Sequence, residues 1–259
     1  MWTLDAAGAL PLWLPLEPAP RAIAAFTTRR GGVSRAPFDS LNLGRSTDDL
    51  PEAVAENRRR VLAGLGADPA RLATAGQVHG ARVVEVTAPG HTPACDALLT
   101  RVPGLVLAVT TADCMPVLVL APDVIAVVHS GWRGTAAGMV RAAYDAVRAA
   151  SAAADEIQVH VGPCIRACCY EVGPEVAERF PAAAVRPVEG ARPRLDLALA
   201  ARLELERAGL PAGAFHDLAE CTACRPQFYY SHRRDGSPSG RQWALAGLRD
   251  ASAPSGARV

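Results

Sequence analysis

The sequence predicts one α/β domain of the mixed α+β kind, in which layered mixed β-sheets are flanked by helices. Half of the 259 residues are hydrophobic, which is enough for one large core. Four apolar runs between residues 81 and 129 lack strict alternation, which is typical of strands covered on both faces. Helical patterns lie on both sides of these runs without regular βαβ alternation. We expect the domain to span residues 1–249 and the tail 250–259 to be disordered.

Residues 1–20 are apolar enough to raise the question of a signal peptide. They lack a basic segment, contain Asp5 and Glu17, and are interrupted by prolines, so they indicate a first strand and loop instead. No apolar run approaches the ~20 residues that a membrane helix needs. Seven cysteines without an export signal indicate reduced thiols. We therefore expect a soluble, cytoplasmic protein with no membrane partner.

The next segments combine a cationic loop with a helix. Residues 21–44 begin as a β-like run and become a loop in which paired arginines adjoin paired glycines, a candidate anion-binding loop. Residues 51–66 predict a helix, because a proline falls in the first turn and apolar residues recur on one face. Arg58, Arg59 and Arg60 point in three directions on this helix, so at most two of them can face a pocket.

The remaining elements follow from apolar runs and helical periodicity. Strands are expected at 81–86, 105–111, 117–121, 124–129, 157–161 and 241–248, and helices at 135–150, 174–180 and 195–208. Residues 122–123 make a tight link between two neighbouring strands, and residues 181–194 suggest a surface loop. His129 and Cys114 therefore fall at strand ends, next to turns.

The charge pattern excludes several classes of function. The net charge is +1, and all 27 residues counted as lysine plus arginine are arginine, because the sequence contains no lysine. A near-neutral chain is unlike a nucleic-acid binder, so no nucleic-acid partner is expected. Mechanisms with a Schiff-base lysine or a P-loop lysine are excluded, and an anionic substrate must meet arginine or backbone amides. We expect a monomer or homodimer.

Three residues carry the strongest chemical signal: His79 in GQVHG, Cys114 in TTADCMP and His129 in VVHSGWRG. Two imidazoles and a thiolate are ligands that select zinc or a similar metal. Three protein ligands leave one tetrahedral position for water or substrate, which is typical of a catalytic zinc site. We therefore expect an enzyme in which His79, Cys114 and His129 hold the metal.

Several longer motifs extend this signal along the chain. QVHG, DALLT, TTADCMPVLV, VVHSGWRGTAAG, GPCIRACCYEVG and YYSHRRDG occur in this order, after TTRRGGVSRAPFDSLNLG. Together they closely resemble the family of bacterial YfiH/YlmD-like proteins, which also contains the animal laccase-domain protein FAMIN. The resemblance runs from about Thr27 to Leu248. The sequence departs from the usual pattern at Ser130, Arg166 and residues 230–232, and the last departure affects the pocket wall near Arg233.

The resemblance implies a mixed α/β fold and a surface-accessible zinc at His79, Cys114 and His129. It also implies purine nucleoside phosphorylase activity, in which adenosine, inosine and S-methyl-5'-thioadenosine react with phosphate to give the base and a ribose 1-phosphate. Adenosine deaminase activity is implied as a second reaction. The expected partners are therefore a purine nucleoside and phosphate.

Each implied reaction requires particular side chains. Deamination needs a general acid as ammonia leaves, and Asp113 is the nearest candidate in sequence. Phosphorolysis needs groups that hold phosphate and stabilise a developing oxocarbenium ion. The candidate phosphate and substrate ligands are Arg29, Arg58, Arg133 and Arg233, with Ser40 and Asn42 for ribose or base contacts.

Two alternative activities use the same three residues. The older family names, polyphenol oxidase and multicopper oxidase, imply copper, but six dispersed histidines are too few for a full set of copper centres. Copper at the His/Cys/His site remains an alternative, because copper exceeds zinc in intrinsic affinity. A cysteine amidase or hydrolase in peptidoglycan precursor editing would use Cys114 as nucleophile and His129 or His79 as base.

The pair Cys221 and Cys224 has the CxxC spacing of a redox motif or zinc knuckle. No second CxxC pair is present to complete a four-cysteine site, although Cys164, Cys168 and Cys169 could lie near it. The sequence therefore favours buried or redox-sensitive thiols over a second zinc.

Overall fold

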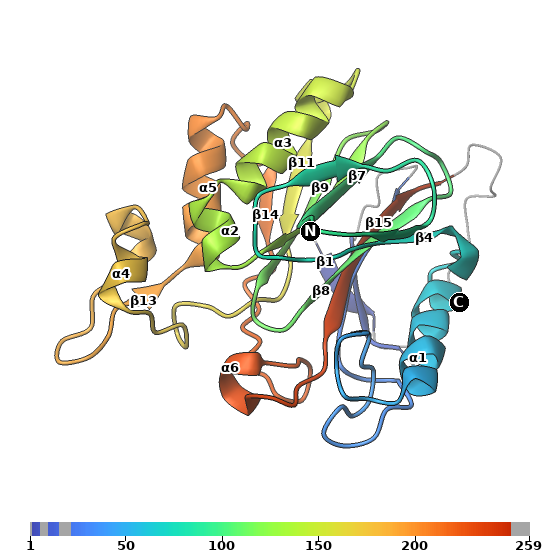
Figure 1. Cartoon of the computed structure of the whole chain (residues 1–259). Coiled ribbons are helices and arrows are strands. Elements are labelled where there is room, and N and C mark those ends of the chain that lie inside the picture. The colour runs from blue at the N-terminus through green and yellow to red at the C-terminus, as the bar shows by residue number, and fades with distance from the viewer. Residues whose placement is uncertain (1, 6–9, 16–21, 250–259) are drawn as a thin grey trace.

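Two mixed β-sheets packed face to face form the centre of the fold (Figure 1). The computed structural model describes residues 2–5, 10–15 and 22–249, so the predicted tail 250–259 lies outside the described residues. The first sheet has the order β1 (Trp2–Asp5), β2 (Leu12–Pro15), β3 (Ala22–Thr27), β15 (Gln242–Leu248), β8 (Val106–Thr111), β4 (Leu72–Ala75), β6 (Gly90–Thr92). The second has the order β14 (Phe215–Asp217), β11 (Gln158–Val161), β9 (Met115–Leu120), β10 (Ile125–Ser130), β7 (Ala97–Thr100), β5 (Val83–Glu85).

Helices cover the outer faces of both sheets (Figure 1). The α-helices are α1 (Pro51–Gly64), α2 (Trp132–Ala136), α3 (Met139–Ala150), α4 (Pro174–Ala177), α5 (Leu197–Arg207) and α6 (His232–Asp235). Single 3₁₀ turns occur at Pro69–Arg71, Ala154–Glu156 and Ala182–Ala184, and β12 (Val185–Arg186) pairs with β13 (Arg194–Leu195). Helix α1 packs on the first sheet, and α3 and α5 pack on the second. The result is a helix–sheet–sheet–helix arrangement.

This layering explains the apolar runs of the sequence. In β9, Val117 and Val119 join the core beneath the helices, whereas Leu118 and Leu120 join the core between the sheets. Successive side chains of a strand point to opposite faces, so a strand covered on both sides must be apolar throughout. The predicted mixed α/β fold class with layered sheets and flanking helices is therefore confirmed.

The longer predicted elements are confirmed with small shifts of their ends. The helix expected at 135–150 is instead two helices, α2 and α3, because Gly138 between them adopts a left-handed backbone with φ +76°. The helix expected at 174–180 ends at Ala177, and the expected loop 181–194 contains the short strand β12. The strand expected at 81–86 is shorter in the structure, where β5 spans residues 83–85.

The strands β4, β6, β7 and β14 were also not expected from the sequence. Each has only three or four residues. Their formation depends on pairing with strands that are distant in sequence, and such short runs carry little periodicity of their own. Within the described ranges, no helix combines the length and apolarity that crossing a membrane requires.

Candidate active site and metal centre

His79, Cys114 and His129 meet at one end of the two-sheet core. Cys114 directly precedes β9 and His129 lies near the end of β10, and the antiparallel register pairs His129 with Pro116. The candidate ligand atoms of the three residues lie within 4.8 Å of one another, and Cys114 Sγ is 3.9 Å from His79 Nε2. The expected meeting of these three residues is therefore observed.

A fully buried carboxylate, Asp96, organises this group. Its Oδ1 accepts hydrogen bonds from the backbone N–H of His79 at 2.9 Å and from Nδ1 of His129 at 2.8 Å. Its Oδ2 accepts from the backbone N–H groups of Val78 at 3.2 Å and Gly80 at 2.7 Å. Because Nδ1 of His129 is engaged, Nε2 is the nitrogen left for a metal. One carboxylate thus orients His129 and fixes the loop that carries His79.

The backbone of His79 is unusual for a residue with a side chain. Its φ is +60°, in the left-handed region that non-glycine residues adopt at a cost. The hydrogen bonds to Asp96 hold this conformation and present the exposed His79 side chain to the site. The sequence analysis did not select Asp96, although it is the acidic residue of the DALLT motif before β7.

Cys114 and His129 strongly influence each other's ionisation. Burial opposes the charged form of Cys114, but hydrogen bonds with His129 and His79 outweigh it and lower the pKa of the thiol to about 6. Burial likewise opposes charge on His129, whereas Asp96 and Cys114 raise its pKa to about 9. Without a metal, the pair therefore exists as a thiolate and an imidazolium at neutral pH.

This ionisation makes the reactivity of Cys114 pH-dependent in chelator-treated protein. The thiolate fraction increases as pH rises through the pKa, so alkylation by iodoacetamide should be half-maximal near pH 6, well below the value of about 8.5 for an ordinary thiol. Peptide mass spectrometry measures this rate separately for each cysteine. Cys164 is the internal control, because burial raises the pKa of its thiol to about 12. Half-maximal labelling of Cys114 above pH 8 would contradict the thiolate–imidazolium pair.

The donor set fits zinc. Imidazole nitrogen and thiolate sulfur are preferred zinc ligands, and three of them leave the fourth tetrahedral position open. Asp96 supplies the outer hydrogen bond that metal-bound histidines almost always make. His79, Cys114 and His129 could therefore hold one zinc ion with a free coordination position.

Gly131 provides the space for this arrangement. A Cβ atom at this position would lie 3.0 Å from Cys114 Sγ and 3.2 Å from His79 Cδ2. Its φ of −81° suits any residue, so a Gly131→Ala substitution acts through steric contact alone. We expect it to weaken zinc affinity by about tenfold, at the lower end of outer-shell effects. Competition with a chromophoric chelator measures this change.

Gly64→Ala is the matched control for this prediction. Gly64 ends α1 far from the three ligands, and an added Cβ there would meet only Leu10 Cδ1 at 3.4 Å, an ordinary contact. Unchanged zinc affinity in Gly131→Ala would show that the ligand positions tolerate a displacement.

A cavity of about 780 Å³ adjoins the three ligands, which form part of its wall. Three arginines line it, Arg45, Arg58 and Arg241, together with His91 and His232. No carboxylate is found among the described residues of the lining. Sequence analysis selected only Arg58 from this set. Arg45 and Arg241 carry no local motif, and only the first sheet and its loops bring them together.

The three arginines keep their charge available to a ligand. Arg58 donates Nε and Nη2 to the carbonyl of Leu43 at 2.9 and 2.6 Å, and its guanidinium lies over the Trp243 ring. Burial, with a smaller contribution from Arg45, lowers the pKa of Arg58 to about 10. Arg241 donates to two backbone carbonyls, and burial lowers its pKa. In the described part of the chain, none of the three forms an ion pair. An anion in the cavity would therefore meet uncompensated positive charge.

Three other candidate substrate residues lie in the loop after β3 and not in the cavity lining. Arg29 pairs with Asp39 at 3.3 Å. Ser40 accepts a hydrogen bond from the backbone N–H of Gly32. Asn42 is fully buried and bonds to neighbouring side chains of its own loop. These polar groups shape the loop that presents Arg45.

The last two candidate arginines are exposed and lie outside the cavity lining as well. The guanidinium of Arg133 lies 4.3 Å from the Trp132 ring centroid at the start of α2. Arg233 lies over the ring of Tyr170 at 5.0 Å and donates Nη1 to the carbonyl of Glu171. The structure therefore brings only Arg58 of the four candidate arginines to the cavity.

Asp113 occupies a supporting position beside Cys114. Its carboxylate accepts from Thr222 Oγ1 and from the backbone N–H of Arg233, both at 2.6 Å. Its carbonyl accepts from the N–H of Ile165 at 2.9 Å, and its own φ is +88°. With both carboxylate oxygens engaged, Asp113 holds two loops and the start of α6 around Cys114. These contacts favour a positioning role over the proton donor expected from sequence.

Fold and site together define an α/β protein in which a His/Cys group able to hold a metal ion lies at the edge of a cationic cavity. Residues 23–249 match the family model described as multi-copper polyphenol oxidoreductase laccase, and the chain belongs to this family, which includes the YfiH and YlmD proteins. The resemblance expected from the sequence motifs is confirmed.

Relatives and solved structures agree with this assignment. A purine nucleoside phosphorylase of Deinococcus radiodurans is 43% identical, covering 91% of this chain and 93% of the relative. One of Pseudomonas aeruginosa is 41% identical, covering 92% and 99%. YlmD from Geobacillus stearothermophilus superimposes with a TM-score of 0.89 at 33% identity, over 96% of this chain and 99% of that one. The names of these relatives support the expectation that this chain is an enzyme.

Proposed function

We propose that this protein is a zinc-dependent purine nucleoside phosphorylase acting on adenosine, inosine and S-methyl-5'-thioadenosine, with adenosine deamination as a second activity. The observation that carries this proposal is the cavity, in which arginines without an ion-pair partner among the described residues adjoin the candidate metal ligands. The names of the relatives support the reaction class. A volume of about 780 Å³ lies in the range of small-molecule pockets and suits a nucleoside with phosphate.

In this proposal the arginines bind the nucleophilic phosphate. Guanidinium groups match phosphate geometry, and Arg45, Arg58 and Arg241 would hold it and position it for attack at C1′ of the ribose. Fixed positive charge also stabilises negative charge that remains on phosphate in the transition state. Zinc bound at His79 and Cys114, with His129, would supply Lewis-acid polarisation at its open position.

Product analysis by mass spectrometry tests the proposal. Zinc-loaded protein is incubated with adenosine, with and without phosphate, and a Cys114→Ala variant is the control. We expect phosphate-dependent adenine and ribose 1-phosphate from the wild type alone, and phosphate-independent inosine if the deaminase is present. Absence of turnover with adenosine, inosine and S-methyl-5'-thioadenosine would reject the nucleoside assignment.

Arg45→Gln is expected to raise the KM for phosphate by at least about tenfold, because a charge-assisted hydrogen bond contributes about 1.5–3 kcal/mol. Arg45 is exposed and forms no ion pair with a described residue, so the substitution leaves folding contacts intact. Initial rates at varied phosphate and saturating nucleoside measure the effect. Arg192→Gln, an exposed arginine in a distant loop, is the matched control. Equal KM values for both variants would place phosphate elsewhere.

One contact supports a second candidate, a cysteine hydrolase acting on amides such as peptidoglycan precursors. Cys114, His129 and Asp96 stand in the order of a thiolate, an imidazolium and an orienting carboxylate. Chelation distinguishes the two functions, since a metal would block a cysteine nucleophile but is required by the phosphorylase. Copper oxidase chemistry is less well supported, because only one His/Cys group in the described chain contains histidine.

A further inference from the structure

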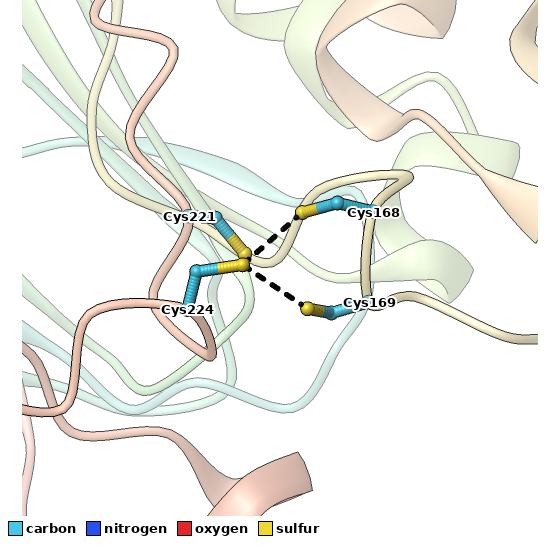
Figure 2. A group of neighbouring side chains, drawn as sticks. All are labelled: Cys168, Cys169, Cys221 and Cys224. Atoms are coloured by element: carbon cyan, nitrogen blue, oxygen red, sulfur yellow. Dashed lines mark hydrogen bonds between the residues drawn. The ribbon is translucent and has the colours of Figure 1, made fainter.

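We propose that Cys168, Cys169, Cys221 and Cys224 bind a second zinc ion in a closed four-thiolate site that joins two loops of the fold. Figure 2 shows the four side chains with their sulfur atoms directed toward one another. Cys168 and Cys169 lie between β11 and α4, whereas Cys221 and Cys224 lie between β14 and α6. This site is separate from the His/Cys/His group and does not depend on the proposed enzymatic activity.

The sulfur positions suit a tetrahedral metal ion. All four sulfur atoms lie within 4.8 Å of one another, and Cys224 Sγ is 3.4 Å from Cys168 Sγ and 3.3 Å from Cys169 Sγ. A zinc ion with Zn–S bonds of about 2.3 Å has sulfur–sulfur edges of about 3.8 Å. A disulfide requires about 2.05 Å, so all four thiols are free in this arrangement. Four sulfur ligands with no histidine or water are typical of a structural zinc site.

Local backbone geometry brings the sulfur atoms together. A turn in which the N–H groups of Cys169 and Tyr170 both donate to the Arg166 carbonyl places two consecutive cysteines on the cluster. The N–H of Cys164 donates to the Glu220 carbonyl, and the N–H of Thr222 donates to the Cys164 carbonyl. These bonds fix the CxxC segment beside the loop that carries Cys168 and Cys169. The adjacent residues Cys168 and Cys169 take the place of a second CxxC motif, which the sequence does not contain.

Two arginines lie beside the proposed site, where four thiolates and one Zn²⁺ would carry a net charge of −2. Each of them also pairs with a carboxylate, Arg166 with Asp217 and Arg234 with Asp235. Arg234 donates Nη1 to the carbonyls of Thr222 and Ala223, the two residues between the CxxC cysteines. Arg166 donates Nε to the carbonyl of Glu220. Both cations thus lie against the loop that carries two of the ligands.

The proposed zinc would also brace the candidate active site. Thr222, which lies between Cys221 and Cys224, donates its hydroxyl to Asp113, the residue before Cys114. Because both cysteines would be held by one ion, Thr222 would be fixed relative to the opposite loop. The second zinc therefore acts as a structural crosslink behind the wall of the first site.

Metal analysis of the full chain tests the proposal. Wild type, Cys114→Ala, Cys224→Ser and Cys164→Ala are purified with zinc under reducing conditions, and bound metals are measured by plasma mass spectrometry. We expect two zinc ions per chain in the wild type, one in Cys114→Ala, one in Cys224→Ser, and two in Cys164→Ala. Cys164 is the matched control, because it is a buried neighbour that lies outside the sulfur cluster.

X-ray absorption of Cys114→Ala gives a readout that requires no substitution in the cluster. Four sulfur neighbours at about 2.3 Å and no nitrogen are expected for the remaining zinc. Protection of the four cysteines from alkylation in the native protein should disappear after chelation. A Cys114→Ala protein without zinc, with iron instead, or with a disulfide among the four cysteines would overturn the proposal. These outcomes are independent of nucleoside turnover, so failure here leaves the proposed function untouched.

Discussion

Replacing Cys114 by alanine is expected to remove zinc from the His/Cys/His site and to lower kcat/KM for phosphorolysis by at least about 10²–10³-fold, the loss typical of removing one electrostatic stabiliser. Cys114 is the only anionic member of the group, and hydrogen bonds from His129 and His79 keep its thiolate stable near neutral pH. Two neutral imidazoles alone hold zinc weakly. Steady-state kinetics with adenosine and phosphate measures the loss.

The alanine variant should remain folded, because Cys114 is only partly buried at the start of β9 and alanine removes a single heavy atom. Thermal melting followed by circular dichroism checks this point. Cys164→Ala serves as the control for losing a thiol without losing a ligand. A folded Cys114→Ala protein with wild-type kcat/KM would mean that the reaction takes place elsewhere in the molecule.

Asp96→Asn should weaken zinc binding by about 10–100-fold and also destabilise the fold. Each carboxylate oxygen of Asp96 accepts two hydrogen bonds, so an amide NH₂ in place of either oxygen faces two donors. Two buried donors without acceptors cost about 2–6 kcal/mol in the free energy of unfolding. Urea denaturation measures this loss, and chelator competition measures zinc affinity.

Asp123→Asn is the matched control for Asp96→Asn. Asp123 accepts hydrogen bonds from the Ser151 side chain and the backbone N–H of Ala152 beyond the end of α3, away from the metal ligands. It should lose some stability while keeping zinc affinity unchanged. Wild-type zinc affinity in Asp96→Asn would contradict an orienting role of Asp96 for His129.

The sequence predicted those parts of the molecule that local chemistry specifies. The strands around β9 were recognisable because both of their faces are buried, and His79, Cys114 and His129 stood out because their residue types are metal ligands. Asp96 escaped notice because its role depends on contacts with two loops, and a single acidic residue before a strand carries no distinctive pattern.

Arginine roles were the least predictable part of the candidate site. Arg29, in the cationic loop, is paired with Asp39, whereas Arg45 and Arg241 reach the cavity from segments about 200 residues apart. The cysteine cluster likewise required two loops to meet and a pair of adjacent cysteines to take the place of a CxxC motif. Long-range packing, which no local pattern encodes, decides each of these cases.

The hydrogen bonds of Asp96 couple the positions of His79 and His129. Asp96 Oδ1 accepts hydrogen bonds from both His129 Nδ1 and the backbone N–H of His79. A local opening that moves Asp96 away from one histidine therefore also breaks its hydrogen bond to the other. The site therefore behaves as a cooperative unit, and partial release of a single histidine is disfavoured. If the proposed zinc is bound here, its exchange with solution would consequently be governed by one opening event of the loop at residues 78–80, and not by stepwise detachment of ligands.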